Sequence, residues 1–276
     1  MTFQDVYDAL LARWEVPVEQ LELTDEFGTT HVNACGPADG PPVVLLPGHG
    51  ATSPVWFAVA PRLAERHRVY AVDLICDAGR STNTGRKPKT PADLHTWLTN
   101  TLDGLGLAQI ALCGHSYGSW IALTYTLAHP DRIDRLALVD PTDSYLPLRL
   151  PYVLRALPSL LRPSQARTKS FLRWETQGLP VDPGWLDLAG LAAEQPASPF
   201  VRTRRPTDDQ LRNLSPTPLV FIADHSKSQN PTKLTQRVTT LTPTATVVHL
   251  TTATHHSLPA LHADEVVPAL AKHLGS

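Results

Sequence analysis

The segment Gly114-His115-Ser116-Tyr117-Gly118 has the residue types and spacing of a nucleophile held on a sharp turn. It follows an apolar run and precedes an apolar helical segment, so it lies where a strand passes into a helix. Glycines on both sides let the backbone turn tightly and point the serine hydroxyl outward. The helix start also offers free backbone N–H groups near any developing negative charge. The spacing therefore predicts Ser116 as a nucleophile.

Three long stretches of the chain resemble the α/β-hydrolase family, in the same order along the sequence. Residues 43–82 (VVLLPGHGATSPVWFAVAPRLAERHRVYAVDLICDAGRST) look like the family's third strand, oxyanion loop, first helix and fourth strand. Residues 110–140 (IALCGHSYGSWIALTYTLAHPDRIDRLALVD) look like its nucleophile elbow, the following helix and the sixth strand. Residues 254–274 (THHSLPALHADEVVPALAKHL) look like the segment with the catalytic histidine and the last helix. The resemblance covers nearly the whole chain and implies a serine hydrolase.

A serine hydroxyl needs a base that takes its proton near neutral pH, and histidine has a suitable pKa. The chain has 12 histidines, of which His255 and His256 compete for this role. In the family the catalytic histidine leads into the last helix with the spacing His-x-x-Pro, which His256-Ser257-Leu258-Pro259 matches. The resemblance therefore predicts His256 as the base, with His255 as the alternative.

The third member of such a triad is a carboxylate that orients the imidazole and stabilises its protonated form. In the family it most often lies four positions into a Gly-x-x-Asp turn after the seventh strand. This chain reads Ala223-Asp224-His225-Ser226 there, so Ser226 replaces the carboxylate. The family's other placement, after the sixth strand, holds Asp140. We predict Asp140 as the acid, with Asp224, or no carboxylate at all, as the alternatives.

Attack on a carbonyl carbon produces an oxyanion, which needs preorganised N–H donors. The N–H of Tyr117, directly after the serine, is one candidate donor. The resemblance implies a second donor in Gly48-His49-Gly50, where His49 matches the family's position. We therefore predict His49 and Tyr117 as the oxyanion and substrate-binding residues.

No metal or cofactor is expected. The histidines near the carboxyl end of the chain lack zinc-site spacings such as His-Glu-x-x-His. Residues 48–50 lack the Gly-x-x-x-x-Gly-Lys-Ser/Thr pattern of a phosphate-binding loop, and no dinucleotide-binding fingerprint is present.

Unbroken apolar runs alternate with helical segments, which is the pattern of an α/β fold. Such runs are typical of strands buried on both faces of a mostly parallel sheet. The predicted strands are Val43–Leu46, Val69–Val72, Ile110–Cys113, Leu136–Val139, Leu219–Ala223 and Thr246–Leu250, preceded by an antiparallel pair at Gln20–Phe27 and Thr29–Ala34. The predicted helices of this core are Val55–Glu65, Ala92–Leu105, Ser119–Ala128, Pro231–Leu241 and Leu258–Leu274. We expect a central sheet of about eight strands flanked by helices.

Residues 141–215 break this alternation, because they offer helical fragments but no clear strand. Prolines divide the stretch into short pieces. They are Pro147, Pro151, Pro158, Pro163, Pro180, Pro183, Pro196 and Pro199. The predicted fragments are Tyr152–Leu161, Ala166–Thr176 and Trp185–Ala193. We predict a helical cap, inserted after the sixth strand, over the carboxyl edge of the sheet, where ligands bind in open α/β sheets.

The whole chain is therefore expected to be one domain, with a core at 18–140 and 216–276, a cap at about 141–215 and an amphipathic amino-terminal helix at about 3–14. Cap aromatics that face the elbow would form an apolar pocket for an acyl or alcohol group. The candidates are Tyr145, Tyr152, Phe171, Trp174, Trp185 and Phe200. The cap also carries arginines, which we expect on a solvated helix face. They are Arg149, Arg155, Arg162, Arg167 and Arg173.

The composition argues against several other classes of protein. Lys and Arg number 24 against 26 Asp and Glu, and a formal net charge of -2 gives no charge-driven attraction to nucleic acid or to an anionic membrane. Asp5 and Asp8 interrupt any secretory signal, and no apolar run is long enough to span a membrane. Three scattered cysteines fit a reducing compartment. We expect a cytoplasmic protein.

These motifs lead us to expect a serine hydrolase that cleaves a carboxylic ester, thioester or lactone through an acyl-enzyme intermediate. Its partner would be a small-molecule acyl substrate. Because a fold does not fix a function, two alternatives remain. One is an acyl transferase, cyclase or lyase on the same scaffold, and the other is a non-enzymatic ligand-binding protein.

Overall fold

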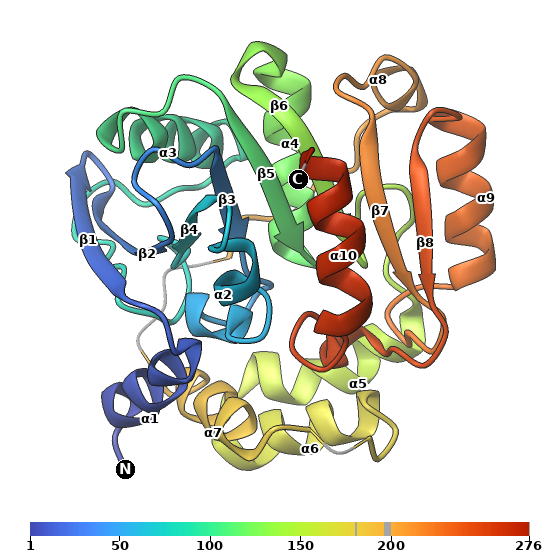
Figure 1. Ribbon diagram of the computed structural model, residues 1–276. Coiled ribbons are helices and arrows are strands. Elements are labelled where there is room, and N and C mark those ends of the chain that lie inside the picture. Colours follow the sequence, from blue (N-terminus) through green and yellow to red (C-terminus); the bar gives the residue numbers. More distant parts are fainter. Residues whose placement is uncertain (180, 196–199, 276) are drawn as a thin grey trace.

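An eight-stranded sheet forms the centre of the computed structural model, which describes residues 1–179, 181–195 and 200–275 (Figure 1). The strands lie in the order β1-β2-β4-β3-β5-β6-β7-β8. Their bounds are β1 Val18–Asp25, β2 Gly28–Cys35, β3 Pro42–Leu46, β4 Arg68–Val72, β5 Ile110–His115, β6 Ile133–Val139, β7 Pro218–Ala223 and β8 Thr246–Leu250. The pairs β1–β2 and β2–β4 are antiparallel, and the other pairs are parallel. The predicted α/β fold is confirmed.

The burial of each strand explains its sequence pattern. All six residues of β7 are buried, as expected for an interior strand of the sheet with helices on both faces. Successive side chains of β3 enter opposite cores, with Val43 and Leu45 on one face and Val44 and Leu46 on the other. The edge strand β1 instead mixes exposed and partly buried residues, which matches its alternating sequence.

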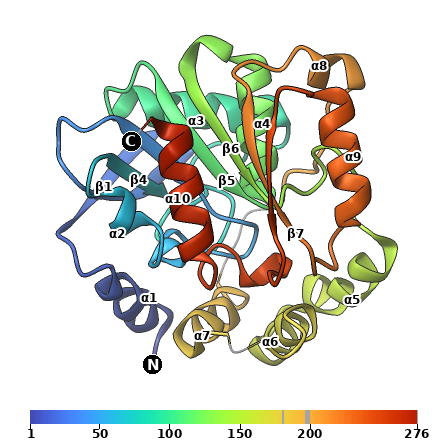
Figure 2. The same ribbon diagram turned by 45° about the vertical axis from the view of Figure 1, so that its right-hand side comes forward.

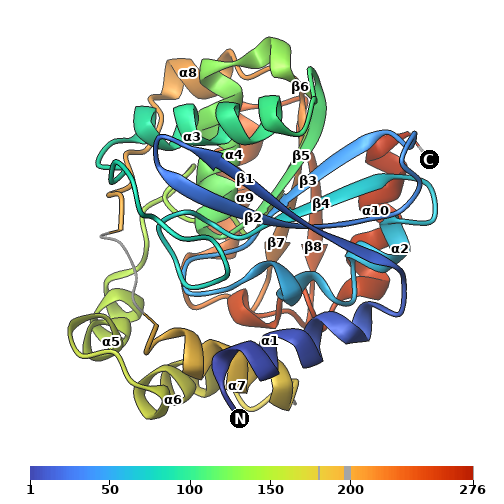
Figure 3. The ribbon, with the colours of Figure 1, turned by 90° about the vertical axis from the view of Figure 1, so that its left-hand side faces the viewer.

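Helices cover both faces of this sheet (Figure 3). On one face lie α3 (Pro91–Gly104), α4 (Tyr117–Ala128) and α9 (Pro231–Leu241). On the other lie α2 (Ala60–Leu63) and α10 (Ala263–Leu274). Because α4 begins directly after β5, the turn between them lies at the carboxyl end of a central strand.

A helical cap lies beyond the carboxyl ends of the parallel strands (Figures 1 and 2). It contains α5 (Leu150–Leu161), α6 (Gln165–Glu175) and α7 (Pro183–Ala192), and α8 (Asp208–Arg212) follows before the chain enters β7. The described residues between β6 and β7 form no strand. Pro180, Pro196 and Pro199 of the predicted proline series lie outside the described residues.

The amino-terminal helix α1 (Phe3–Leu11) packs against the cap helix α7 (Figure 3). Its apolar side chains are buried, so the predicted amphipathic helix is docked on the body of the protein. Tyr7 on this helix donates a hydrogen bond of 2.9 Å to the buried carboxylate of Asp73, directly after β4. No helix of the described chain has the length and apolar character needed to span a bilayer.

Two predicted helices are shorter than expected, and proline accounts for both differences. The segment 55–65 divides into a 3-10 turn at Ser53–Trp56 and the short α2, where Pro61 occupies the first turn. The last helix begins at Ala263 rather than Leu258, because Pro259 holds Leu258 in an extended conformation. The five-residue helix α8 was not predicted, since it is too short to show a periodic pattern.

Candidate functional site

Ser116 occupies a strained turn between β5 and α4. Its backbone angles are φ 54° and ψ -115°, a conformation that residues with side chains rarely adopt. The flanking glycines are required by space: a Cβ on Gly114 would overlap the carbonyl oxygen of Gly118, and a Cβ on Gly118 would overlap that of Leu46. The sequence folds this way because only glycine allows the helix start to approach β3 so closely.

A chain of hydrogen bonds joins Ser116 to a buried histidine and a buried aspartate. The Ser116 hydroxyl lies 2.8 Å from His255 Nε2, and His255 Nδ1 lies 2.5 Å from Asp140 Oδ2. The side chains of His255 and Asp140 are buried, whereas Ser116 is partly accessible. Since a carboxylate only accepts, Nδ1 carries the proton and Nε2 presents a lone pair to the serine hydroxyl. This is the arrangement that a base needs to remove a proton from Ser116.

The structure does not bring the predicted base, His256, to Ser116. Its Nε2 lies 2.9 Å from the hydroxyl of Tyr152 on α5, and the two rings stack. The reason is the 3-10 turn at His255–Ser257, in which successive side chains project about 120° apart. Only one of two adjacent rings can then face the serine. His256, chosen from the spacing to Pro259, thus lies against Tyr152, and the ring beside Ser116 is that of His255.

Hydrogen-bond donors surround the Asp140 carboxylate and stabilise its ionised form. Burial opposes ionisation, but hydrogen bonds from His255, Ser226 and the Ala223 N–H lower the pKa of Asp140 below its usual value. The Ser226 hydroxyl donates at 2.9 Å, from the position where the family's usual carboxylate would lie. Ser226, at the family's usual acid position in the sequence, and Asp140, at the other position, therefore lie side by side.

Asp224, the alternative acid, lies apart from this group. Its carboxylate contacts His249 Nδ1 at 2.6 Å, and both side chains are partly exposed. The Asp224 carboxylate therefore points to the surface and not to His255, whose Nδ1 contacts Asp140 instead.

Two further groups that sequence reasoning missed hold the histidine loop. The buried carboxylate of Glu175, on α6, accepts hydrogen bonds from the backbone N–H groups of His255, His256 and Lys227, at 3.1, 2.9 and 3.2 Å. His115 Nε2 lies 3.0 Å from the carbonyl oxygen of His255, and burial lowers the pKa of His115 to about 3, so the ring stays neutral and donates. A signal for Glu175 was available, because it is the only acidic residue between Ser144 and Leu179.

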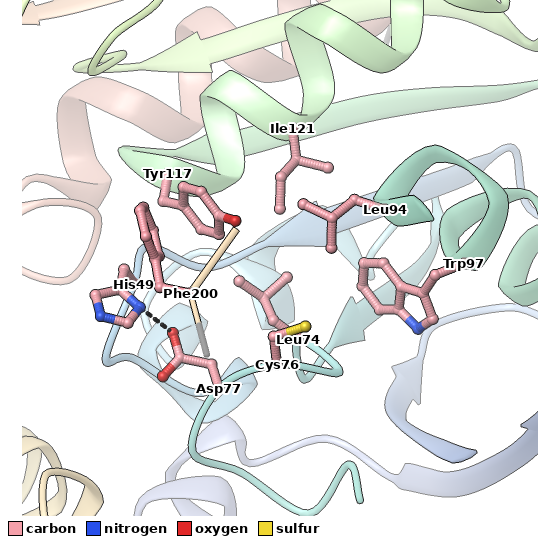
Figure 4. Close-up of a pocket in the computed structure, with 9 residues that line it drawn as sticks. All are labelled: His49, Leu74, Cys76, Asp77, Leu94, Trp97, Tyr117, Ile121 and Phe200. Atoms are coloured by element: carbon pink, nitrogen blue, oxygen red, sulfur yellow. Dashed lines mark hydrogen bonds and ion pairs between the residues drawn. The ribbon is translucent and has the colours of Figure 1, made fainter. Parts of the chain in front are cut away.

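The loop that follows β3 approaches the turn at Ser116. A Cβ on Gly48 would lie 3.1 Å from the Cβ of Ser116, so the backbone here passes close to the serine. The ring of His49 lies beside Asp77, with Nδ1 2.8 Å from the carboxylate (Figure 4). Tyr117 opens α4, where backbone N–H groups have no acceptor within the helix. These positions suit His49 and Tyr117 as backbone donors.

A small pocket with mostly apolar walls adjoins these two residues. Figure 4 shows His49, Phe200 and Tyr117 at one end and Trp97 at the other. Its lining is His49, Leu74, Cys76, Asp77, Leu94, Trp97, Tyr117, Ile121 and Phe200. Of the predicted cap aromatics, Phe200 lines this pocket. Tyr152 and Phe171 instead contact the ring of His256, and Trp174 packs against these two rings. Tyr145 and Trp185 are buried elsewhere in the two cores.

The described residues contain no group of three or more His, Cys, Asp or Glu side chains that could hold a metal ion. Cys35, Cys76 and Cys113 are buried and free.

The sequence matches that of a known protein family. A model of the alpha/beta hydrolase family matches residues 43–269. The chain therefore belongs to the α/β-hydrolase family.

Among its relatives, carboxylesterase YbfK of Bacillus subtilis is 30% identical over 176 residues, which cover 64% of this chain and 58% of that protein. The uncharacterized carboxylesterase nap of the same species is 31% identical over 155 residues, covering 56% and 51%. The matched segments thus span little more than half of these relatives. The crystal structure of naproxen esterase from B. subtilis is similar over 99% of this chain and 96% of the other, with a TM-score of 0.90 at 25% identity.

Glu175→Gln tests whether the hydrogen bonds from the histidine loop to this cap carboxylate stabilise the loop. The amide keeps one acceptor oxygen but turns an N–H₂ group toward backbone donors, so we expect the free energy of unfolding to fall by about 2 kcal/mol. Hydrogen exchange in residues 253–258 should also accelerate. The control is Glu194→Gln, an exposed cap carboxylate, which should change stability by less than about 0.5 kcal/mol. Equal effects of the two variants would contradict this role of Glu175.

Proposed function

We propose that the protein is a carboxylic ester hydrolase in which Ser116 is the nucleophile, His255 the base and Asp140 the acid. The hydrogen-bonded chain from Ser116 through His255 to Asp140 carries the proposal. The carboxylesterase names of the relatives support the choice of substrate class. Thioesters and lactones pass through the same kind of tetrahedral intermediate and remain within the proposal.

In the proposed first step, His255 Nε2 takes the proton of Ser116 as the oxygen bonds to the carbonyl carbon of the ester. The backbone N–H groups of His49 and Tyr117 would stabilise the oxyanion. Asp140 stabilises the imidazolium that forms. Collapse of the intermediate breaks the bond to the alcohol oxygen, which takes the proton from His255. The alcohol leaves, and the acyl group stays covalently bound to Ser116.

In the second step, water attacks the acyl carbon while His255 takes its proton, and collapse returns that proton to Ser116. The acid product leaves, and the site is restored. The apolar walls around Phe200, Tyr117 and Leu74 suit an apolar acyl or alcohol group.

The free, buried cysteines support the reducing, cytoplasmic location that we expected.

Ser116→Ala should lower hydrolysis of p-nitrophenyl butyrate by a factor of about 10⁴ or more, because the acyl-enzyme can no longer form. A fluorophosphonate should label wild-type protein at Ser116, as read by peptide mass spectrometry, and should fail to label the variant. Full turnover by Ser116→Ala would refute the mechanism. An unlabelled wild type would favour a ligand-binding protein, and a labelled one that yields transferred or cyclised product would favour the other reaction classes.

His255→Gln and His256→Gln form a matched pair that tests the base. We expect kcat/KM to fall by a factor of about 10³ or more for His255→Gln and by less than about 10-fold for His256→Gln. The rate of fluorophosphonate labelling should follow the same order, since it reports the reactivity of the serine. The opposite order would return the role of base to His256.

Asp140→Asn should lower kcat by about 10⁴-fold while thermal unfolding stays cooperative, because the amide no longer holds the reactive tautomer of His255. Asp224→Asn is the control and should retain wild-type activity. Since the Ser226 hydroxyl lies 2.9 Å from Asp140 Oδ2, adding Ser226→Asp to Asp140→Asn should recover at least 10-fold of the lost activity. Loss of activity in Asp224→Asn alone would overturn the assignment.

A further inference from the structure

The outer face of helix α5 exposes an apolar stripe. Leu150, Leu154, Leu157 and Leu161 follow one another at the i, i+4, i+7 and i+11 positions, which lie on one face of a helix. The exposed leucines of this helix are Leu150, Leu154, Leu157, Leu160 and Leu161, with exposed fractions from 40% to 71%. The opposite face buries Tyr152 and Ala156 against the body of the protein. Figures 2 and 3 place α5 at the periphery of the cap. The stripe is therefore an apolar surface that faces outward.

This stripe lies in the most basic part of the chain. Between Ser144 and Trp174 the sequence has no Asp or Glu, but it has Lys169 and five arginines, Arg149, Arg155, Arg162, Arg167 and Arg173. Lys169 pairs with Asp187 on α7, at 2.6 Å. None of the five arginines forms an ion pair with another described residue. The surroundings of the leucines thus carry uncompensated positive charge.

We propose that the α5 surface docks on an anionic lipid surface. This surface is defined by the five exposed leucines, by Arg149, Arg155 and Arg162 on α5 and its caps, and by Arg167 of α6, whose guanidinium donates to the carbonyl oxygen of Arg162. Leucines on one face of a helix that lies in the membrane interface enter the boundary between headgroups and acyl chains. Nearby arginines are attracted to anionic headgroups, and each contributes to binding. This local charge overrides the expectation drawn from the net charge of -2, because attraction within a Debye length depends on the groups that face the membrane.

A second copy of the chain is the less suitable occupant. A symmetric dimer that joined the two α5 stripes would bring the same arginines of both copies together. Like charges at an interface oppose association, whereas an anionic surface complements both the leucines and the arginines.

The inner face of α5 places this surface next to the proposed active site. Tyr152, on the same helix, hydrogen-bonds to His256, the neighbour of His255. A protein docked through α5 would therefore hold its cap, and the site beneath it, at the lipid boundary. The docking itself does not depend on the proposed chemistry, so it is testable with the inactive Ser116→Ala protein.

Binding of full-length Ser116→Ala protein to large unilamellar vesicles tests the proposal. Vesicles of phosphatidylcholine with 30 mol % phosphatidylglycerol, as a stated test composition, are compared with pure phosphatidylcholine by co-sedimentation. We expect binding at least 10-fold tighter to the anionic vesicles and weaker binding in high salt. Adding Leu154→Ser, Leu157→Ser and Leu161→Ser should weaken binding at least 10-fold, and so should adding Arg162→Gln and Arg167→Gln instead.

The matched control is Leu261→Ser, an exposed leucine outside the cap, which should bind like the parent protein. Thermal unfolding checks that each variant is folded, as expected for polar substitutions at exposed positions. No binding to anionic vesicles, or binding that the α5 substitutions leave unchanged, would overturn the proposal. A dimer in analytical ultracentrifugation that the leucine substitutions dissociate would also overturn it, in favour of a second copy.

Discussion

The buried contact between His255 and Asp140 is the interaction on which the rest of the site depends. A carboxylate taken out of water is costly unless it is paired and hydrogen-bonded. Here the imidazole, the Ser226 hydroxyl and the Ala223 N–H meet that requirement together. The same contact fixes the ring so that Nε2 faces Ser116. Charge, tautomer and orientation are thus set by one arrangement of donors around Asp140.

The sheet and the cap contribute different parts of this arrangement. Ser116 and Asp140 follow the neighbouring parallel strands β5 and β6, so the backbone of the sheet brings them to one edge. His255 lies on a loop after β8 and depends on contacts from elsewhere. Glu175 of the cap accepts from its N–H, and His115 donates to its carbonyl oxygen. The cap therefore supports the histidine as well as covering the site, because its buried carboxylate requires donors that the histidine loop supplies.

The two faces of α5 have opposite environments. Tyr152 packs inward beside His256, while the leucine stripe faces outward and Arg149 and Arg162 at the two ends of the helix are exposed. A net charge of -2 hides this asymmetry, since acidic residues elsewhere in the chain balance a cap segment that has none between Ser144 and Trp174. Local composition mapped on the structure is thus more informative about partners than the total charge.

The sequence by itself determined the layered α/β architecture and the location of Ser116, because buried strands and a glycine-flanked turn are local patterns. It also narrowed the base to two histidines, and the acid to two aspartates or to no carboxylate at all. Only the tertiary structure shows which of them lie beside Ser116, and it is on this geometry that the proposed roles rest. His255 and His256 differ by the direction in which a 3-10 turn points each ring, and Asp140 and Asp224 by whether the side chain reaches the buried imidazole or the surface. Such directions depend on contacts between residues that are distant in the sequence, such as His255 with Ser116 and Asp140, and spacing along the chain does not encode these contacts.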